Sequence, residues 1–211
     1  MYLAHTPTVV QRLFGQFMWR GRDHDRRVYL TFDDGPIPEV TPWVLDTLAR
    51  FGAKATFFCV GENVQRYPGL FARVRAQGHA VGNHTFNHVS GWSTEVADYV
   101  ANVAACDRLV GSPLFRPPYG RISPRKALAL RRDYRIVMWD VLSGDFDPGL
   151  TGEECAANVL GHASPGSIIV FHDSLKAEAN LRLALPRVLS ALARQGYRFD
   201  ALTPEVTPVA G

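Results

Sequence analysis

The sequence predicts an α/β fold in which parallel β-strands alternate with α-helices, arranged either as a barrel or as a doubly wound sheet. Short apolar runs alternate with helical periodicities along nearly the whole chain, and a glycine follows four of the helical patterns. A glycine in this position commonly takes the left-handed conformation that ends a helix. At 211 residues the chain has the length of one domain with a full hydrophobic core.

The expected strands are short runs rich in β-branched and aromatic residues. In chain order they are Arg27–Phe32, Ala55–Val60, His79–Val81, Leu114–Arg116, Ile136–Trp139, Ser167–Phe171 and Tyr197–Phe199. The helical patterns between and after them cover Pro38–Phe51, Tyr67–Gln77, Thr94–Val110, Pro124–Arg131, Thr151–His162 and Glu178–Gln195. The glycines that follow helices are Gly52, Gly78, Gly111 and Gly196. Because helices separate the strands, we expect the strands to run parallel with helices covering them.

Residues 1–27 are expected to form a helical extension ahead of a main domain that spans residues 28–211. Within the extension, one face of a helix over Thr6–Trp19 would carry the apolar residues Val9, Val10, Leu13, Phe14, Phe17 and Met18. We expect this face to pack on the underside of the domain. The alternative is a helix that lies on a membrane surface, which the charges of Arg12 and Arg20 would favour.

The composition, with 46% hydrophobic and 20% charged residues, is that of an ordinary globular protein. A net charge of +3 without a run of Lys or Arg argues against a nucleic-acid partner. No apolar stretch is long enough to span a membrane, and the N-terminus shows no signal-peptide pattern, so the default expectation is a cytoplasmic protein. The widely spaced Cys59, Cys106 and Cys155 suggest neither a disulfide framework nor a cysteine metal site. None of these features predicts the oligomeric state.

Polar clusters follow five of the expected strands, at the ends where the active sites of parallel α/β folds form. The first cluster is Asp33 and Asp34, directly after an apolar run. A buried pair of carboxylates is costly unless a cation or a proton compensates it. The other clusters contribute His84 and His88, Arg116 and Tyr119, Asp140 and Asp145, and His172 and Asp173. Each cluster alone could be a turn or a surface feature, but their shared position indicates one site.

The spacing of His84 and His88 would place both imidazoles on one face of a helical turn. Two histidines and one acid, with one coordination position left open, are typical of a catalytic zinc site. Asp34 can supply the carboxylate, and its neighbour Asp33 would then be free for chemistry. We therefore expect one divalent metal, with Zn²⁺ as first choice and Co²⁺ or another transition metal as alternatives.

The segments TFDDGP, HTFNH and RPPYG, and the strand that ends in His172, resemble the motifs of the polysaccharide deacetylase family, also known as the NodB-homology domain and carbohydrate esterase family 4. The resemblance covers residues 28–202 and implies a distorted seven-stranded (β/α) barrel. It implies a metal-dependent hydrolase of linear amide bonds that removes N-acetyl groups from an N-acetylglucosamine-containing glycan, chitin-like or peptidoglycan-like, and releases acetate. The alternatives are an O-acetyl esterase on xylan-like glycans and a catalytically inactive carbohydrate-binding module.

The resemblance also implies a role for each residue that matches a motif. Asp33 would be the catalytic base, and Arg116 would orient it. The backbone N–H of Tyr119 would stabilise the oxyanion, and His172 would be the general acid. The metal ligands would be Asp34, His84 and His88.

Four further residues are expected to contact the substrate: Asp140, Asp145, Phe146 and Val170. Val170 stands where the family usually has a leucine that lines the acetyl pocket.

The fourth motif departs from the family pattern. The family commonly has two acids three residues apart followed by Trp, whereas this chain has Leu142, Asp145 and Phe146 in these places. Asp140 lies two residues before Leu142 and would share its face if the strand continued. Asp140 is therefore a candidate to replace the missing acid and to tether the catalytic arginine or histidine.

Overall fold

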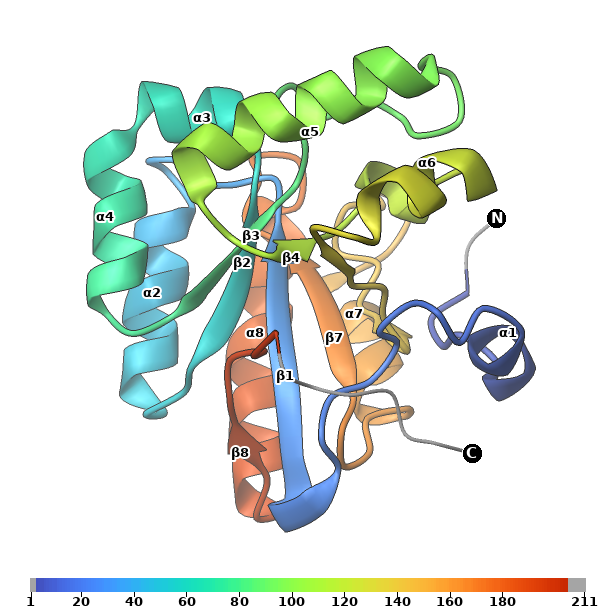
Figure 1. The fold of residues 1–211 in the computed structure, drawn as a ribbon. Coiled ribbons are helices and arrows are strands. Elements are labelled where there is room, and N and C mark those ends of the chain that lie inside the picture. The colour runs from blue at the N-terminus through green and yellow to red at the C-terminus, as the bar shows by residue number, and fades with distance from the viewer. Residues whose placement is uncertain (1–2, 205–211) are drawn as a thin grey trace.

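The computed structural model describes residues 3–204 and shows a curled parallel sheet with helices around it (Figure 1). The strands lie in the order β5-β4-β3-β2-β1-β7-β6, and β8 pairs with β1 outside this path. All paired strands run parallel. The two edge strands, β5 and β6, follow each other directly in the chain, so the curled sheet is an open barrel. The predicted (β/α) barrel is confirmed.

The observed strands agree with the prediction to within a few residues. They are β1 (Arg27–Asp33), β2 (Ala55–Cys59), β3 (Ala80–Asn83), β4 (Leu114–Phe115), β5 (Arg135–Ile136), β6 (Val141–Leu142), β7 (Ile168–His172) and β8 (Arg198–Phe199). The sequence does not predict β6 as a separate strand. The expected strand Ile136–Trp139 overlaps only β5, and β6 begins after Asp140, because the chain leaves one edge of the sheet and joins the other edge within a few residues.

The helices likewise follow the predicted order, with α3 as an additional short helix. They are α1 (Thr8–Leu13), α2 (Thr41–Arg50), α3 (Gly61–Arg66), α4 (Pro68–Ala76), α5 (Val96–Val110), α6 (Pro124–Leu130), α7 (Gly152–Leu160) and α8 (Glu178–Arg194), with single 3₁₀ turns η1 (His24–Arg26) and η2 (Pro118–Gly120). The four glycines expected after helices all have positive φ, as predicted. A capping box, in which the Thr151 and Glu154 side chains each accept a hydrogen bond from the other residue's backbone N–H, starts α7.

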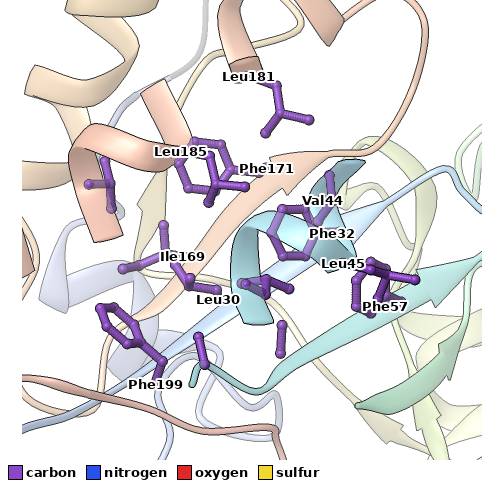
Figure 2. Packing of buried hydrophobic residues seen from close by; sticks show 14 of the residues in the cluster. Leu30, Phe32, Val44, Leu45, Phe57, Ile169, Phe171, Leu181, Leu185 and Phe199 are labelled. Carbon is purple, nitrogen blue, oxygen red and sulfur yellow. The ribbon is translucent and has the colours of Figure 1, made fainter. Parts of the chain in front are cut away.

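The main hydrophobic core lies between the outer face of the sheet and its covering helices (Figure 2). Phe32 of β1 stacks at 5.0 Å between ring centroids on Phe57 and at 6.1 Å on Phe171. Burying a phenylalanine of this kind stabilises the fold by about 1.5–3 kcal/mol. Because successive side chains of a strand point to opposite faces, Thr31 and Asp33 face the inside of the barrel instead. Strand β1 thus separates the core from the polar interior.

The N-terminal segment differs from the prediction of a helix over residues 6–19. Helix α1 covers only Thr8–Leu13 and buries no residue, with Val9 and Leu13 being 71% and 74% exposed. After a turn the chain becomes extended, and Met18 forms a parallel bridge with Val137. Backbone pairing with the open edge of the barrel therefore replaces the helical conformation that the apolar periodicity predicts. Among residues 3–204, no helix is both long and apolar enough to cross a membrane.

Candidate active site

One cavity of about 450 Å³ opens at the carboxyl ends of the strands. Strands β1 and β7 and the segments after β3 and β4 bring side chains to it from four parts of the chain. Its charged or titratable walls include Asp33, Asp34, His84, His88 and His172. Its apolar walls include Trp139, Leu142, Phe146 and Val170. The structure therefore brings most of the predicted site residues together, with Phe146 and Val170 on the apolar side.

Asp34, His84 and His88 form a cluster suited to a metal ion. One ligand atom from each residue lies within 4.8 Å of the other two. Asp34 Oδ1 is 3.2 Å from His88 Nε2 and 3.8 Å from His84 Nε2. Two imidazole nitrogens and one carboxylate oxygen are a donor set that Zn²⁺ favours, and three protein ligands leave a position open.

The hydrogen bond of His84 decides which ring nitrogen faces the cluster. His84 Nδ1 lies 2.8 Å from the carbonyl oxygen of Arg116, which can only accept, so Nδ1 carries the proton. Burial lowers the pKa of His84 to about 4, although Asp33 opposes the shift, and the ring is neutral at pH 7. The lone pair on Nε2 is therefore available to a metal, as fixed histidine ligands require.

Asp34 is held in its ionised form. Burial alone would raise the pKa of this carboxyl, but the hydrogen bond with His88 and the nearby His172 and His84 outweigh burial and keep its pKa well below the usual range. The cluster thus combines a neutral nitrogen donor at His84 with an ionised oxygen donor at Asp34. Metal binding requires these protonation states.

Asp33 and Arg116 form a buried ion pair beside the cluster. Arg116 is fully buried, and its Nη1 donates to Asp33 Oδ1 at 2.7 Å and to Thr31 Oγ1 at 2.7 Å. Its Nη2 donates to the carbonyl oxygen of Met138 at 3.1 Å. The guanidinium also lies 4.1 Å above the centre of the Phe58 ring. A planar cation with this many fixed partners holds the Asp33 carboxylate in one orientation at the cavity wall.

His172, which also lines the cavity, is tethered by Asp145. Asp145 Oδ1 accepts a hydrogen bond from His172 Nδ1 at 2.7 Å, and Oδ2 accepts one from the His172 backbone N–H at 2.8 Å. Burial would lower the pKa of His172, but the Asp145 carboxylate outweighs burial and raises it to about 9. His172 is therefore an imidazolium at neutral pH, with Nε2 as its remaining donor.

Asp140 does not take the tethering role that the sequence suggests for it. Its fully buried carboxylate binds Arg20, accepts from Ser167 Oγ at 2.9 Å and accepts from the Ile168 backbone N–H at 2.8 Å. Burial raises its pKa to about 6. The reason is local: β6 begins only at Val141, so the strand alternation counted back from Leu142 does not extend to residue 140. Asp140 holds the N-terminal segment and does not line the cavity.

The backbone around the site is strained at four residues other than glycine. Asp34, Thr85, His88 and Tyr119 have φ angles of 85°, 64°, 57° and 61°, in the left-handed region that residues other than glycine rarely adopt. Strain of this kind persists where surrounding contacts impose it, and it concentrates at functional sites. The ring of Tyr119 lies 4.8 Å from the ring of His88, between their centroids. Tyr119 therefore stands next to the metal-ligand cluster, as its position in the sequence predicts.

The motifs do not identify three residues that line the cavity, Trp139, Arg121 and Lys176. Trp139 lies so close to Gly120 that a Cβ at Gly120 would approach its ring within 2.6 Å. Two cations flank the cavity, since Arg121 lies 5.0 Å from the Trp92 ring centre and Lys176 lies 5.6 Å from that of Phe146. Only their position in space identifies them, because exposed cations and aromatic residues are common throughout a sequence.

Asp173, which is buried and does not line the cavity, supports the turn that follows β1. Its Oδ1 accepts from the Gly35 backbone N–H at 3.0 Å, and its Oδ2 accepts from Thr41 Oγ1 at 2.5 Å. Burial raises the pKa of Asp173 to about 8. The residue follows the last predicted catalytic histidine, but the sequence alone does not indicate this supporting contact.

Comparisons with known proteins agree with this geometry. Residues 20–137 match the family model described as polysaccharide deacetylase. A peptidoglycan-N-acetylglucosamine deacetylase of Bacillus cereus is 37% identical over 192 residues, which cover 88% of this chain and 90% of that protein. A chitooligosaccharide deacetylase of Azorhizobium caulinodans is 32% identical over 194 residues, covering 83% of this chain and 92% of that protein.

Solved structures show the same similarity in three dimensions. The crystal structure of a peptidoglycan N-acetylglucosamine deacetylase in complex with an N-oxidanyl-benzamide compound superimposes with a TM-score of 0.81 at 32% identity, covering 93% of this chain and 95% of that chain. A family 4 carbohydrate esterase from Streptomyces lividans in complex with acetate gives a TM-score of 0.78 at 27% identity, covering 88% of this chain and 98% of that chain. The similarity therefore extends over nearly the whole fold.

Proposed function

The chain belongs to the polysaccharide deacetylase family, and on that premise we propose how its own residues carry out the reaction. It is a metal-dependent hydrolase that removes N-acetyl groups from a glycan containing N-acetylglucosamine. The observation that supports this most directly is the meeting of three elements around one cavity: the Asp33–Arg116 pair, the cluster around Asp34, and the His172–Asp145 pair. Its relatives are named for peptidoglycan or chitooligosaccharides, and we propose a glycan of one of these types as its substrate.

The metal is held by Asp34, His84 and His88 in this proposal. Their ligand atoms are close enough for one ion, and His84 is neutral with Nε2 turned inward, so these residues fit the group. The nitrogen-rich donor set favours Zn²⁺, with Co²⁺ as the alternative of similar preference. When bound, such an ion would polarise the substrate carbonyl and would lower the pKa of a bound water molecule from about 15.7 to about 7.

The residues around the cluster divide the proton transfers between them. Asp33, held by Arg116, takes a proton from the attacking water. The backbone N–H of Tyr119 donates to the oxygen that gains negative charge. His172 gives its Nε2 proton to the sugar nitrogen as the C–N bond breaks, so an amine and acetate leave. The proton donor is needed because an amine anion is a very poor leaving group.

The acetyl methyl group would pack against the apolar wall of the cavity. Leu142 and Val170 are buried neighbours in the paired strands β6 and β7, and both line the cavity close to His172. Phe146 contacts His172, with 5.1 Å between their ring centroids. In this proposal Asp145 acts through His172 and has no direct contact with substrate. Nothing in the described cavity favours the O-acetyl esterase or the inactive binding module over the deacetylase.

Acetate release tests this function. Metal-loaded protein should release acetate from peptidoglycan fragments or from N-acetylglucosamine oligomers more readily than from acetylxylan. A strong chelator should abolish this activity, and Zn²⁺ or Co²⁺ should restore it. His88→Ala should lose the metal. Asp33→Asn should retain the metal and still lose activity by about 10²–10⁴-fold, the usual size of acid–base catalysis. Full activity in chelator, with no stoichiometric metal, would exclude the proposed metal site.

A further inference from the structure

The N-terminal segment, residues 3–21, lies across the open edge of the barrel (Figure 1). Near its start, the Leu142 backbone N–H donates to the carbonyl oxygen of Ala4, and the Thr6 N–H donates to the carbonyl oxygen of Asp140, both at 2.8 Å. Near its end, the Met18 N–H donates to Ile136 at 2.8 Å and the Met18 carbonyl accepts from Met138 at 2.7 Å. The segment therefore connects the β6 edge to the β5 edge.

The buried carboxylate of Asp140 fixes this segment in place. It binds Arg20, whose Nη2 also donates to the carbonyl oxygen of Pro165 at 2.6 Å and to Ser164 Oγ at 2.9 Å. The Gly21 backbone N–H donates to Gly166 at 2.8 Å. These contacts lie far apart in the sequence, and together they give the segment a defined position on the barrel.

A second cavity, of about 310 Å³, lies between this segment and the catalytic cavity. On the side of the N-terminal segment it is lined by Leu3, Thr6, Pro7, Val10 and Trp19. On the barrel side it is lined by Met138 together with Tyr119, Gly120, Trp139 and Leu142, and the last four also line the catalytic cavity. The two cavities are therefore neighbours that share a wall.

We propose that the second cavity binds the sugar unit next to the one that is deacetylated, in the same glycan chain. This inference rests on the proposed function, because a polymeric substrate must continue beyond the reacting sugar. The shared wall places the cavity beside the site of reaction. Its volume is at the lower end of the range of ligand pockets, about 300–1,000 Å³, which suits one ring.

The chemistry of the lining favours a neutral sugar ring. Among the described residues, no Asp, Glu, Lys, Arg or His lines the second cavity. Trp19 and Trp139 offer aromatic faces, on which the C–H face of a pyranose can pack, while Thr6 offers a polar group for a hydroxyl. A charged group would lose its hydration there without gaining an ion pair. The N-terminal segment would thus form part of the substrate cleft in addition to closing the barrel.

Adjacent valines on α1 provide a matched test. Val10 lines the cavity, whereas Val9 is 71% exposed and does not. Acetate release by the zinc-loaded protein would be measured with N-acetylglucosamine oligosaccharides of two to six sugars and with nitrophenyl acetate, which occupies only the catalytic cavity. Val10→Asp should lower kcat/KM on the longer oligosaccharides by roughly ten-fold, through KM, and leave the ester rate unchanged. Val9→Asp should match the original protein on every substrate.

A second variant and thermal unfolding separate binding from folding. Val10→Phe would fill the cavity without adding charge and should give the same loss on long substrates at an unchanged Tm. Equal losses on oligosaccharide and ester, or no loss on either, would overturn the inference. If phosphatidylglycerol vesicles bound the original protein and Val9→Asp but not Val10→Asp, the cavity would be a lipid site, which would also overturn it.

Failure of the proposed function would be recognised separately. In that case the original protein would release acetate from none of the glycans. Calorimetric binding of the same oligosaccharides would still test the second cavity: tighter binding of longer chains, lost in Val10→Asp and kept in Val9→Asp, would support it. Binding that did not differ between the two variants would reject it.

Discussion

At the scale of single residues, the contact between His172 and Asp145 determines the charge state of the imidazole that we propose as the general acid. Burial alone would lower the pKa of the imidazole, but the carboxylate at 2.7 Å outweighs it and raises the pKa from 6.5 to about 9. The folded state therefore binds this proton more tightly than the unfolded chain. The resulting stabilisation is fully present below about pH 6.5 and is lost as the pH rises through about 9.

The same pair predicts where activity falls at alkaline pH. If His172 is the acid, it must be protonated to act, so kcat/KM on an N-acetylated glycan should decline at alkaline pH, and the Asp145 carboxylate, which raises the pKa of the imidazole, should place this decline above pH 6.5. Asp145→Asn removes the charge and leaves burial, which lowers the pKa, so this decline should move to a lower pH. The measurement is a pH profile of acetate release.

The exposed Asp133→Asn is the control and should leave the profile in place. The decline should be much weaker with an activated acetyl ester, whose leaving group departs without a proton. An unchanged profile for Asp145→Asn would mean that another group controls the alkaline side.

At the scale of elements, strand β1 and the turn after it position Asp33, the proposed base, and Asp34, the proposed metal ligand. Leu30 and Phe32 face the core, which fixes the register of the strand and so directs Asp33 to the interior, where Arg116 binds it. Asp34 leaves the strand in a left-handed conformation. Asp173, which directly follows β7, holds the turn through Gly35 and Thr41.

Asp173→Ala should therefore loosen the turn. Among residues 3–204 it removes the only hydrogen-bond acceptor of the Gly35 N–H, and it deprives Thr41 Oγ1 of its acceptor. Leaving a buried donor unsatisfied costs roughly 1–3 kcal/mol, so we expect a loss of unfolding free energy of this size, together with weaker zinc binding. Denaturant unfolding and metal titration measure the two effects.

Asp46→Ala, which removes an exposed ion pair with Arg73, is the control and should change neither the free energy of unfolding nor the free energy of zinc binding by more than about 1 kcal/mol. Normal zinc affinity in a destabilised Asp173→Ala protein would contradict the supporting role.

At the scale of the whole molecule, the N-terminal segment closes the gap that the consecutive strands β5 and β6 leave in the barrel. The ion pair between Arg20 and Asp140 joins residues that are 120 positions apart in the chain. Burial raises the pKa of Asp140 to about 6, so its charged form is costly in the folded state unless Arg20 compensates it.

Arg20→Ala should destabilise the protein in a pH-dependent way. Asp140 has a raised folded pKa, so its stabilising, protonated form is lost as the pH rises through about 6, and without Arg20 the charged form has no cation beside it. Because Arg20 is 31% exposed and partly screened, we expect a loss of about 1–3 kcal/mol at pH 8 and a smaller loss at pH 5. Denaturant unfolding at both pH values measures it, with the exposed Arg73→Ala as control. A loss of equal size at both pH values would show that the charge of Asp140 is not its cause.

The sequence by itself determined the order of strands and helices apart from β6 and α3, the left-handed glycines after helices, and most of the titratable residues that line the cavity. Asp33, Arg116 and His172 lie at the ends of apolar runs, which can be read from the local sequence. Parallel strands bring such positions to one edge of the sheet. Only the tertiary structure decided that Asp145 tethers His172, that Asp140 binds Arg20, and that residues 3–21 line a cavity. These depend on how the chain crosses between the edges of an open barrel. Local periodicity contains no information about this crossing, because the contacts that fix it join residues far apart in the chain.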